Sequence, residues 1–244
     1  MSVVAIIPAR YASSRLPGKP LLARTGKTLI QHVVETAGRA RCLAAVHVAT
    51  DDQRIFDAVT AFGGSAVMTR ADHVSGTDRL AEAAGKLGLA DEDIVINVQG
   101  DEPEMNPAYI ERLAHLVADT AAPMATLAAP LEATAALSPN SVKVVCNREG
   151  MAMYFSRARI PFDRDAAGAG YLLHLGIYAY RKAFLLRFAA MAPTPAEKIE
   201  KLEQLRVLEN GFPIAVAVVE SANPGIDTPE DYEAFLVRQA RQQT

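Results

Sequence analysis

Three cationic side chains, Arg10, Arg15 and Lys19, lie within the fourteen-residue stretch PARYASSRLPGKPL that begins at Pro8. Its prolines and its glycine restrict the backbone more than a merely solvated loop requires. Arginine binds phosphate oxygens bidentately, lysine acts as a point charge, and backbone N–H groups add further donors. A nucleoside triphosphate, with roughly three to four negative charges, matches this set. The pattern therefore favours a polyphosphate-binding loop over a solvated cluster of charges.

Acidic residues mark two further loops. Asp101 and Glu102 follow the most hydrophobic stretch of the chain, residues 94–98, and Asp227 precedes the last predicted helix. Carboxylates beside phosphates commonly bind Mg²⁺, which prefers oxygen ligands. A structural interpretation stands beside this one, because Gly, Asp and Pro form turns and Thr228-Pro229 is a good helix start. Capping by Thr228 leaves Asp227 available, so there the two interpretations are compatible.

Familiar phosphate and metal motifs are excluded. Gly26-Lys27-Thr28 imitates the end of a Walker A loop, but Leu21 stands where the first glycine is required, and no GxGxxG follows the first strand. These residues instead predict a turn and a helix N-cap at Thr28. Metal-ligand spacing is absent among four of the histidines, His32, His47, His73 and His115.

Alternating elements position the three loops. We predict strands at residues 3–7, 45–49, 65–69 and 94–98, separated by helices at 29–39, 53–62 and 77–87. Ligands of open α/β sheets bind outside the carboxyl ends of the strands, where the first two loops lie. The order predicts an α/β protein with a doubly wound, mostly parallel, Rossmann-like sheet.

The alternation of strands and helices stops after a helix predicted at 107–117. Strands at 124–131, 142–147 and 172–180 alternate with irregular segments, which predicts an inserted mixed β/α elaboration at about 124–210. A helix at 198–209 ending near Gly211, a strand at 214–219 and a helix at 230–242 complete the chain. No repeat or clear linker is visible, so we expect a single domain over residues 1–244.

Composition narrows the class of protein. Half of the 244 residues are hydrophobic, enough for a full core, and the net charge of −3 gives no basis for non-specific binding to nucleic acid or anionic membranes. Arg10 interrupts the N-terminal apolar run, so no signal peptide or membrane span is expected. The two cysteines, Cys42 and Cys146, lie outside any CxxC spacing and indicate free thiols. We therefore expect a cytoplasmic protein with no nucleic-acid or membrane partner.

Four motifs in order carry a family resemblance: PAR with SRLPGKPL in the first loop, SGTDR at 75–79, QGDEP at 99–103 and DTPED at 227–231. The set closely resembles the 3-deoxy-D-manno-octulosonate (Kdo) cytidylyltransferases, also called CMP-Kdo synthetases, essentially end to end. The first motif alone is shared by many sugar nucleotidyltransferases. The resemblance implies a nucleotidyltransferase fold and a cytoplasmic, Mg²⁺-dependent homodimer that joins CTP and Kdo into CMP-Kdo, releasing pyrophosphate, for lipopolysaccharide biosynthesis. It also implies that the inserted element carries dimer contacts.

The resemblance implies roles for individual residues. Arg10 and Lys19 would hold the triphosphate, Lys19 would stabilise charge at the reacting α-phosphate, and Arg15 would act on the departing pyrophosphate. Asp101 and Asp227 would be the metal ligands, with Mg²⁺ activating the attacking 2-hydroxyl. The nucleotide would be surrounded by Pro8, Ala9, Ser75, Thr77, Asp78 and Arg79.

An acidic sugar needs a cation and several hydrogen-bonding groups. The resemblance points to Gln99, Arg157, His174, Tyr178, Glu203 and Gln204. Each also has a structural interpretation, such as a surface cation for Arg157 or a solvated charge for Glu203. Two other functions stay open: a cytidylyltransferase for another acidic sugar, such as sialic acid or an amino analogue of Kdo, and a non-catalytic nucleotide-binding protein. No role is predicted for Asn223.

Overall fold

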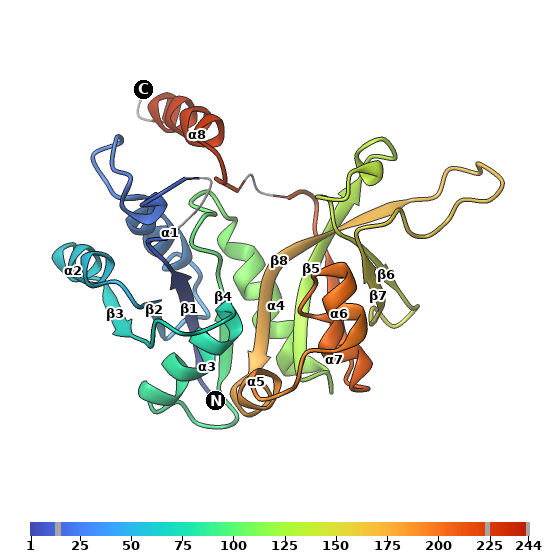
Figure 1. Cartoon of the computed structure of the whole chain (residues 1–244), viewed down its shortest axis with the longest axis horizontal. Coiled ribbons are helices and arrows are strands. Elements are labelled where there is room, and N and C mark those ends of the chain that lie inside the picture. Colours follow the sequence, from blue (N-terminus) through green and yellow to red (C-terminus); the bar gives the residue numbers. More distant parts are fainter. Residues whose placement is uncertain (13–15, 223–224, 243–244) are drawn as a thin grey trace. The chain divides into compact units, whose positions relative to one another are not determined.

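The computed structural model describes residues 1–12, 16–222 and 225–242, so Arg15 and Asn223 lie outside the described residues (Figure 1). The chain divides into two compact units, one of Met1–Glu111 with Asn223–Thr244 and one of Arg112–Ala222. The elaboration predicted at about 124–210 lies wholly within the second unit. Within the described ranges, no helix is both long and apolar enough to cross a membrane.

A parallel sheet forms the centre of the first unit. Its strands are β1 (Val3–Ala9), β2 (Ala45–Thr50), β3 (Ser65–Met68) and β4 (Ile94–Asn97), in the order β3-β2-β1-β4. Every residue of β4 is buried, as expected of a parallel strand with both faces covered. The chain runs outward from β1 to β3 and then returns to the other side of β1. This order places a topological switch point between β1 and β4, where such sheets bind ligands.

Local capping sets the start of the helices in this unit. These are α1 (Leu29–Ala37), α2 (Gln53–Ala61), α3 (Gly76–Lys86) and α8 (Pro229–Gln242), with the short 3₁₀ helix η1 (Lys19–Leu21) at the end of the first loop. The predicted caps are confirmed: Thr28 accepts from the N–H of Gln31, and Thr228 accepts from the N–H of Asp231. Each cap satisfies a backbone donor that the helix leaves unpaired.

Packing of α8 on α1 holds the last acidic loop in place. Ile226, Tyr232 and Phe235 form a buried cluster with Leu29, and Ile226 is fully buried. Burying a side chain of this size contributes roughly 1.5–3 kcal/mol. Ile226 immediately precedes Asp227, so the carboxylate is carried on an anchored backbone rather than on a free loop.

The second unit contains a mixed sheet, as the sequence predicts. In it β5 (Met124–Leu131) runs antiparallel to β8 (Tyr171–Arg181) and parallel to β9 (Ile214–Val218). The short strands β6 (Lys143–Cys146) and β7 (Ala152–Ser156) pair with each other, and β6 also meets β8. Beside them lie η2 (Ala135–Leu137), α5 (Lys182–Ala189), α6 (Pro195–Glu200) and α7 (Leu205–Glu209); α4 (Pro107–Asp119) joins the units along the chain (Figure 1).

The prediction of one helix over 198–209 is wrong. Lys201 adopts a left-handed conformation with φ of 54°, which ends α6 and separates it from α7. The guanidinium of Arg157 donates to the carbonyls of Glu200 and Lys201 at this point, so a distant residue satisfies backbone acceptors that a continuous helix would use itself. Gly211 follows α7 with φ of 79°, the helix end that the sequence predicts. Strand β7 and helix α5 are additional to the predicted elements.

Candidate functional site

A cavity of about 440 Å³ lies in the first unit at the switch point between β1 and β4. Its lining comes mainly from the loops that follow these two strands, together with the start of α3 and the loop before α8. Seven of the predicted site residues line it: Pro8, Ala9, Arg10, Lys19, Gln99, Asp101 and Asp227. Loops far apart in the sequence thus meet as the strand-end rule predicts.

Lys19 joins the cationic loop to both acidic loops. Its Nζ donates to Asp101 Oδ2 at 2.8 Å, to Asp227 Oδ1 at 3.3 Å and to the carbonyl of Ile226 at 2.8 Å. The lysine side chain is 14% exposed, against 29% for Asp101 and 45% for Asp227. One cation therefore faces two carboxylates, and the group keeps a net negative charge that can attract a further cation.

Two glycines let the backbone adopt the positions that this arrangement requires. Gly18 has φ of 68° directly before η1, and a Cβ there would lie 3.2 Å from the hydroxyl of Tyr11. A Cβ on Gly100 would lie 3.1 Å from the carbonyl of Pro8, so glycine allows the loop after β4 to approach the end of β1. Lys19 and Asp101 consequently follow positions where a larger residue would displace the backbone.

The two acidic loops are also joined through the backbone. The N–H of Ile226 donates to the carbonyl of Asp101 at 2.9 Å. Because this bond lies beside both carboxylates, their separation is set by main-chain geometry as well as by Lys19. The predicted convergence of Asp101 and Asp227 is therefore present in the structure.

The donor chemistry of this pair fits Mg²⁺. Magnesium is usually bound by one or two protein carboxylates and completes its coordination with water and substrate phosphates. Among the described residues, no group of three or more His, Cys, Asp or Glu side chains forms a closed metal site. Two carboxylates directed at one cation beside a cationic loop match a metal shared with phosphate.

Glu102 differs in ionisation from its neighbour Asp101. Burial, reinforced by the negative charge of Asp101, raises the pKa of Glu102 to about 7. Near neutral pH the Glu102 carboxyl is therefore divided between its protonated and ionised forms. Asp101, by contrast, is the carboxylate of this loop that accepts a hydrogen bond from Lys19.

Arg10 connects the first loop to the segment before α3. Its Nη2 donates to the carbonyl of His73 at 2.8 Å and to that of Ser75 at 3.4 Å. The side chain is exposed and lines the cavity. Arg10 thus lies where the sequence places it, next to the predicted nucleotide segment 75–79.

An ionised glutamate of α3, Glu82, holds the residues that lead into that segment. Glu82 accepts from the N–H of Arg70 at 3.0 Å, pairs with Lys86 at 2.8 Å and is hydrogen-bonded to the ring of His73. Burial alone would raise the pKa of Glu82, but these partners lower it to about 2. His73, to which the sequence gives no role, is therefore fixed beside the carbonyl that Arg10 contacts.

The contacts seen at the start of α3 are ones that stabilise the fold. Ser75 and Asp78 form a capping box, which confirms the capped helix start predicted for this motif. Arg79 is fully buried, with its guanidinium 3.1 Å from Asp51 and 2.6 Å from the hydroxyl of Thr69. Thr77 is buried as well. Direct contact of these four residues with a nucleotide stays a prediction.

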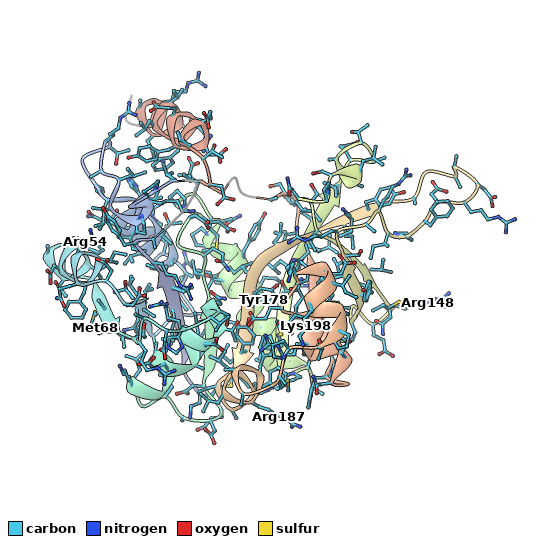
Figure 2. The ribbon with its side chains drawn as sticks, viewed as in Figure 1. Arg54, Met68, Arg148, Tyr178, Arg187 and Lys198 are labelled. Carbon is cyan, nitrogen blue, oxygen red and sulfur yellow. The ribbon has the colours of Figure 1, made fainter. Side chains whose placement is uncertain are left out.

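A contact that the residue patterns do not indicate supports the first loop. Arg54 of α2, labelled in Figure 2, lies with its guanidinium carbon 3.3 Å from the ring centroid of Tyr11. The same guanidinium donates to both carboxylate oxygens of Asp52, at 2.9 and 2.7 Å. This cation–π contact steadies the ring against which Gly18 packs. The alternation of strands and helices does not predict this contact, because Tyr11 and Arg54 are 43 positions apart in the sequence.

The predicted sugar residues, apart from Gln99, lie in the second unit. His174 and Tyr178 are on β8, with ring centroids 5.4 Å apart, and Figure 2 labels Tyr178. Burial lowers the pKa of His174 to about 3, while burial and the charge of Glu203 raise the pKa of Tyr178. Gln204 is buried, and its Nε2 has no hydrogen-bond partner among the described residues. Buried polar groups of this kind need partners, which a polar ligand supplies.

Arg157 has a structural role in the observed geometry. Its guanidinium donates to the carbonyls of Pro139, Glu200 and Lys201 at 3.0, 2.7 and 3.4 Å. The buried ammonium of Lys143 in turn donates to the carbonyl of Arg157 at 2.6 Å. These protein contacts explain the position of the Arg157 side chain without any ligand. Contact between Arg157 and a sugar stays a prediction.

Comparisons with known proteins agree over nearly the whole length of the chain. Residues 4–219 match a family model described as cytidylyltransferase. A 3-deoxy-manno-octulosonate cytidylyltransferase of Syntrophobacter fumaroxidans is 55% identical over 240 residues, which cover 97% of this chain and 96% of that protein. One from Vibrio vulnificus strain CMCP6 is 50% identical, with 98% of each chain covered.

Solved structures confirm the predicted fold. A structure described as CMP:2-keto-3-deoxy-manno-octonic acid synthetase complexed with CTP superposes with a TM-score of 0.95 at 48% identity, covering 99% of this chain and 100% of that one. A cytidylyltransferase from Leptospira borgpetersenii gives a TM-score of 0.63 at 16% identity, covering 99% and 93%, and shows a likeness of fold alone. The chain therefore has the α/β nucleotidyltransferase fold with a mixed, mostly parallel sheet.

Proposed function

Because this chain belongs to the 3-deoxy-manno-octulosonate cytidylyltransferase family, we propose that it transfers CMP from CTP to the anomeric 2-hydroxyl of Kdo and releases pyrophosphate. One observation carries the proposal: Lys19 lies between Asp101 and Asp227 in a cavity that Arg10 also lines. Cations for phosphate and carboxylates for a metal are what nucleotidyl transfer requires. The product would serve lipopolysaccharide biosynthesis.

The cationic loop binds the triphosphate of CTP. Arg10 and Lys19 hold phosphate oxygens, and Lys19 stabilises the charge that develops on the α-phosphate during in-line displacement. Lys19 exchanges part of its present bonding to Asp101 and Asp227 for bonds to phosphate, which leaves the carboxylates available. Arg15, by resemblance, acts on the departing pyrophosphate.

Asp101 and Asp227 are the proposed ligands of Mg²⁺. When bound, the metal supplies charge neutralisation for the phosphates and lowers the pKa of a hydroxyl that contacts it. The backbone bond between Ile226 and Asp101 keeps the two carboxylates at one place before substrate arrives. Such preorganisation lowers the cost of assembling the reactive geometry.

By resemblance, the acceptor sugar is bound in the second unit by Arg157, His174, Tyr178, Glu203 and Gln204; Gln99, which has the same role by resemblance, lines the cavity of the first unit. The burial of His174 and Tyr178 and the unpaired amide of Gln204 support this set. We also propose a homodimer in the cytoplasm. Exposed apolar side chains in the second unit, Met153 at 63% and Ile199 at 82%, support self-association, and the free thiols Cys42 and Cys146 fit a reducing compartment.

Pyrophosphate release from CTP and Mg²⁺ tests the proposed function. We expect release only when Kdo is present, with one CMP-Kdo formed per pyrophosphate. Parallel reactions with sialic acid and with an amino analogue of Kdo separate the acceptors. Release that ignores Kdo would overturn the proposal, as would tight CTP binding with no release for any of these sugars, the behaviour of a non-catalytic nucleotide-binding protein.

Glu82→Gln is expected to raise the KM for CTP about 3- to 10-fold with a smaller change in kcat. Loss of the negative charge frees His73 and with it the segment whose carbonyls Arg10 contacts. Steady-state kinetics with varied CTP measure the effect. Lys86→Gln is the matched control, since it removes another partner of Glu82 and leaves the bond to His73 in place. Equal KM values in the two variants would contradict the prediction.

A further inference from the structure

Thr126 of β5 places one buried hydroxyl among three hydrogen-bonding groups of β8. Its Oγ1 lies 2.8 Å from the carbonyl of Ile177, 3.0 Å from that of Leu175 and 3.1 Å from Nε2 of His174. The Thr126 residue has no exposed surface. All these residues belong to the second unit.

A break in strand register produces this arrangement. Thr126 pairs with Tyr178, whereas Leu127 pairs with Leu175, so β8 carries extra residues at this step. Such a bulge turns backbone groups away from the regular ladder. Here it directs two β8 carbonyls toward the same side chain of β5.

Counting protons assigns the tautomer of His174. A hydroxyl has a single proton to donate, and the two carbonyls only accept. With that proton directed at a carbonyl, Oγ1 is left with lone pairs toward the ring, and the contact is a bond only if Nε2 carries hydrogen. The opposite assignment turns the hydroxyl proton to Nε2 and leaves Oγ1 facing both carbonyl oxygens without a hydrogen between them, whereas the first assignment leaves only one such contact. The second unbridged contact is costly in a buried site.

We propose that Thr126 is a positioning residue that holds His174 in the Nε2–H tautomer, so that Nδ1 accepts a hydrogen bond from a hydroxyl of the sugar. Among the described residues, no hydrogen bond reaches Nδ1. Phe155 and Tyr178 flank the ring with centroids 5.0 and 5.4 Å away, which limits its rotation. Burial also keeps the ring neutral by lowering the pKa of His174 to about 3.

This assignment has a consequence for specificity and rests on the proposed function. A bare Nδ1 accepts from a hydroxyl but repels a carboxylate, which can only accept. His174 therefore selects the hydroxyl face of an acidic sugar and leaves its carboxylate to other groups. Discrimination of this kind depends on which nitrogen carries hydrogen, so the hydroxyl of Thr126 acts on binding without touching the sugar.

Nitrogen-15 NMR of the histidine rings tests the tautomer directly. Protein labelled at histidine is measured without substrate near neutral pH, and His174→Gln identifies the signal that belongs to His174. We expect that signal to show a protonated Nε2 and an unprotonated Nδ1. A protonated Nδ1 would overturn the proposal whether or not the chain turns over Kdo, so its failure is separable from failure of the proposed function.

Variants of Thr126 test the positioning role. Thr126→Val keeps the shape of the side chain and removes the hydroxyl, and we expect it to shift the His174 ring toward the Nδ1–H form and raise the KM for Kdo about ten-fold. The KM for CTP should stay within about two-fold, because uniform damage would change both. Thr126→Ser keeps the hydroxyl and should retain the tautomer and the KM. A Val variant with the wild-type NMR pattern and unchanged KM for Kdo would overturn the role.

Discussion

Asp227→Asn is expected to lower kcat by about 10²- to 10³-fold while the Kd for CTP changes less than about three-fold. The side chain keeps its size and loses its charge. The carboxylate of Asp227 contacts Lys19, while the backbone N–H of Asp227 donates to Asp231 in the first turn of α8. Its proposed role is in the ternary complex with metal and both substrates. Because binding of CTP depends mainly on the cationic loop, the substitution lowers kcat and leaves the Kd for CTP nearly unchanged.

The measurement combines single-turnover kinetics at saturating Mg²⁺ with CTP titration by calorimetry. Glu230→Gln is the matched control, because it removes a carboxylate from the exposed first turn of α8, three residues away. The control should behave as wild type. Near-normal turnover in Asp227→Asn would show that Asp227 is only part of a helix start.

Lys19→Met is expected to lower kcat/KM for CTP by about 10³-fold or more. The substitution removes an ammonium from the lining of the cavity, where we propose that it stabilises charge on the α-phosphate. Lys19→Arg should restore little activity, because a planar guanidinium cannot direct three donors at the two carboxylates and the Ile226 carbonyl as an ammonium does. Kinetics with varied CTP at fixed Mg²⁺ measure both variants.

Thermal unfolding separates this catalytic effect from a structural one. Ion pairs with partly exposed carboxylates contribute about 0–1 kcal/mol, so the melting temperature of Lys19→Met should fall by no more than a few degrees. Lys27→Met, which removes an exposed lysine paired with Glu35, is the control and should keep full activity. Strong destabilisation of Lys19→Met, or activity equal to that of the control, would contradict the assignment.

Local patterns were enough for much of the fold. Thr28, Ser75 and Thr228 each cap a helix through a backbone N–H three residues further on, so the signal lies within a few positions. Strands β1 and β4 of the first unit appear as apolar runs because both of their faces are covered, whereas β3, at the edge of this sheet, has no buried residue. The prediction of one helix over 198–209 was wrong because the deciding contact is not local. Arg157, more than forty positions away, stabilises the left-handed turn at Lys201.

Apolar runs, turn residues and strand order can all be recognised from the residues alone, and they predict that cations and carboxylates follow the ends of parallel strands at one edge of the sheet. The position of Lys19, rather than Arg10, between Asp101 and Asp227 depends on how the folded chain packs. The same packing buries Arg79 and brings Thr126 to His174 across 48 positions. Side-chain pairing and burial depend on the packing of distant segments, and neither is encoded in the spacing of residues along one strand or helix.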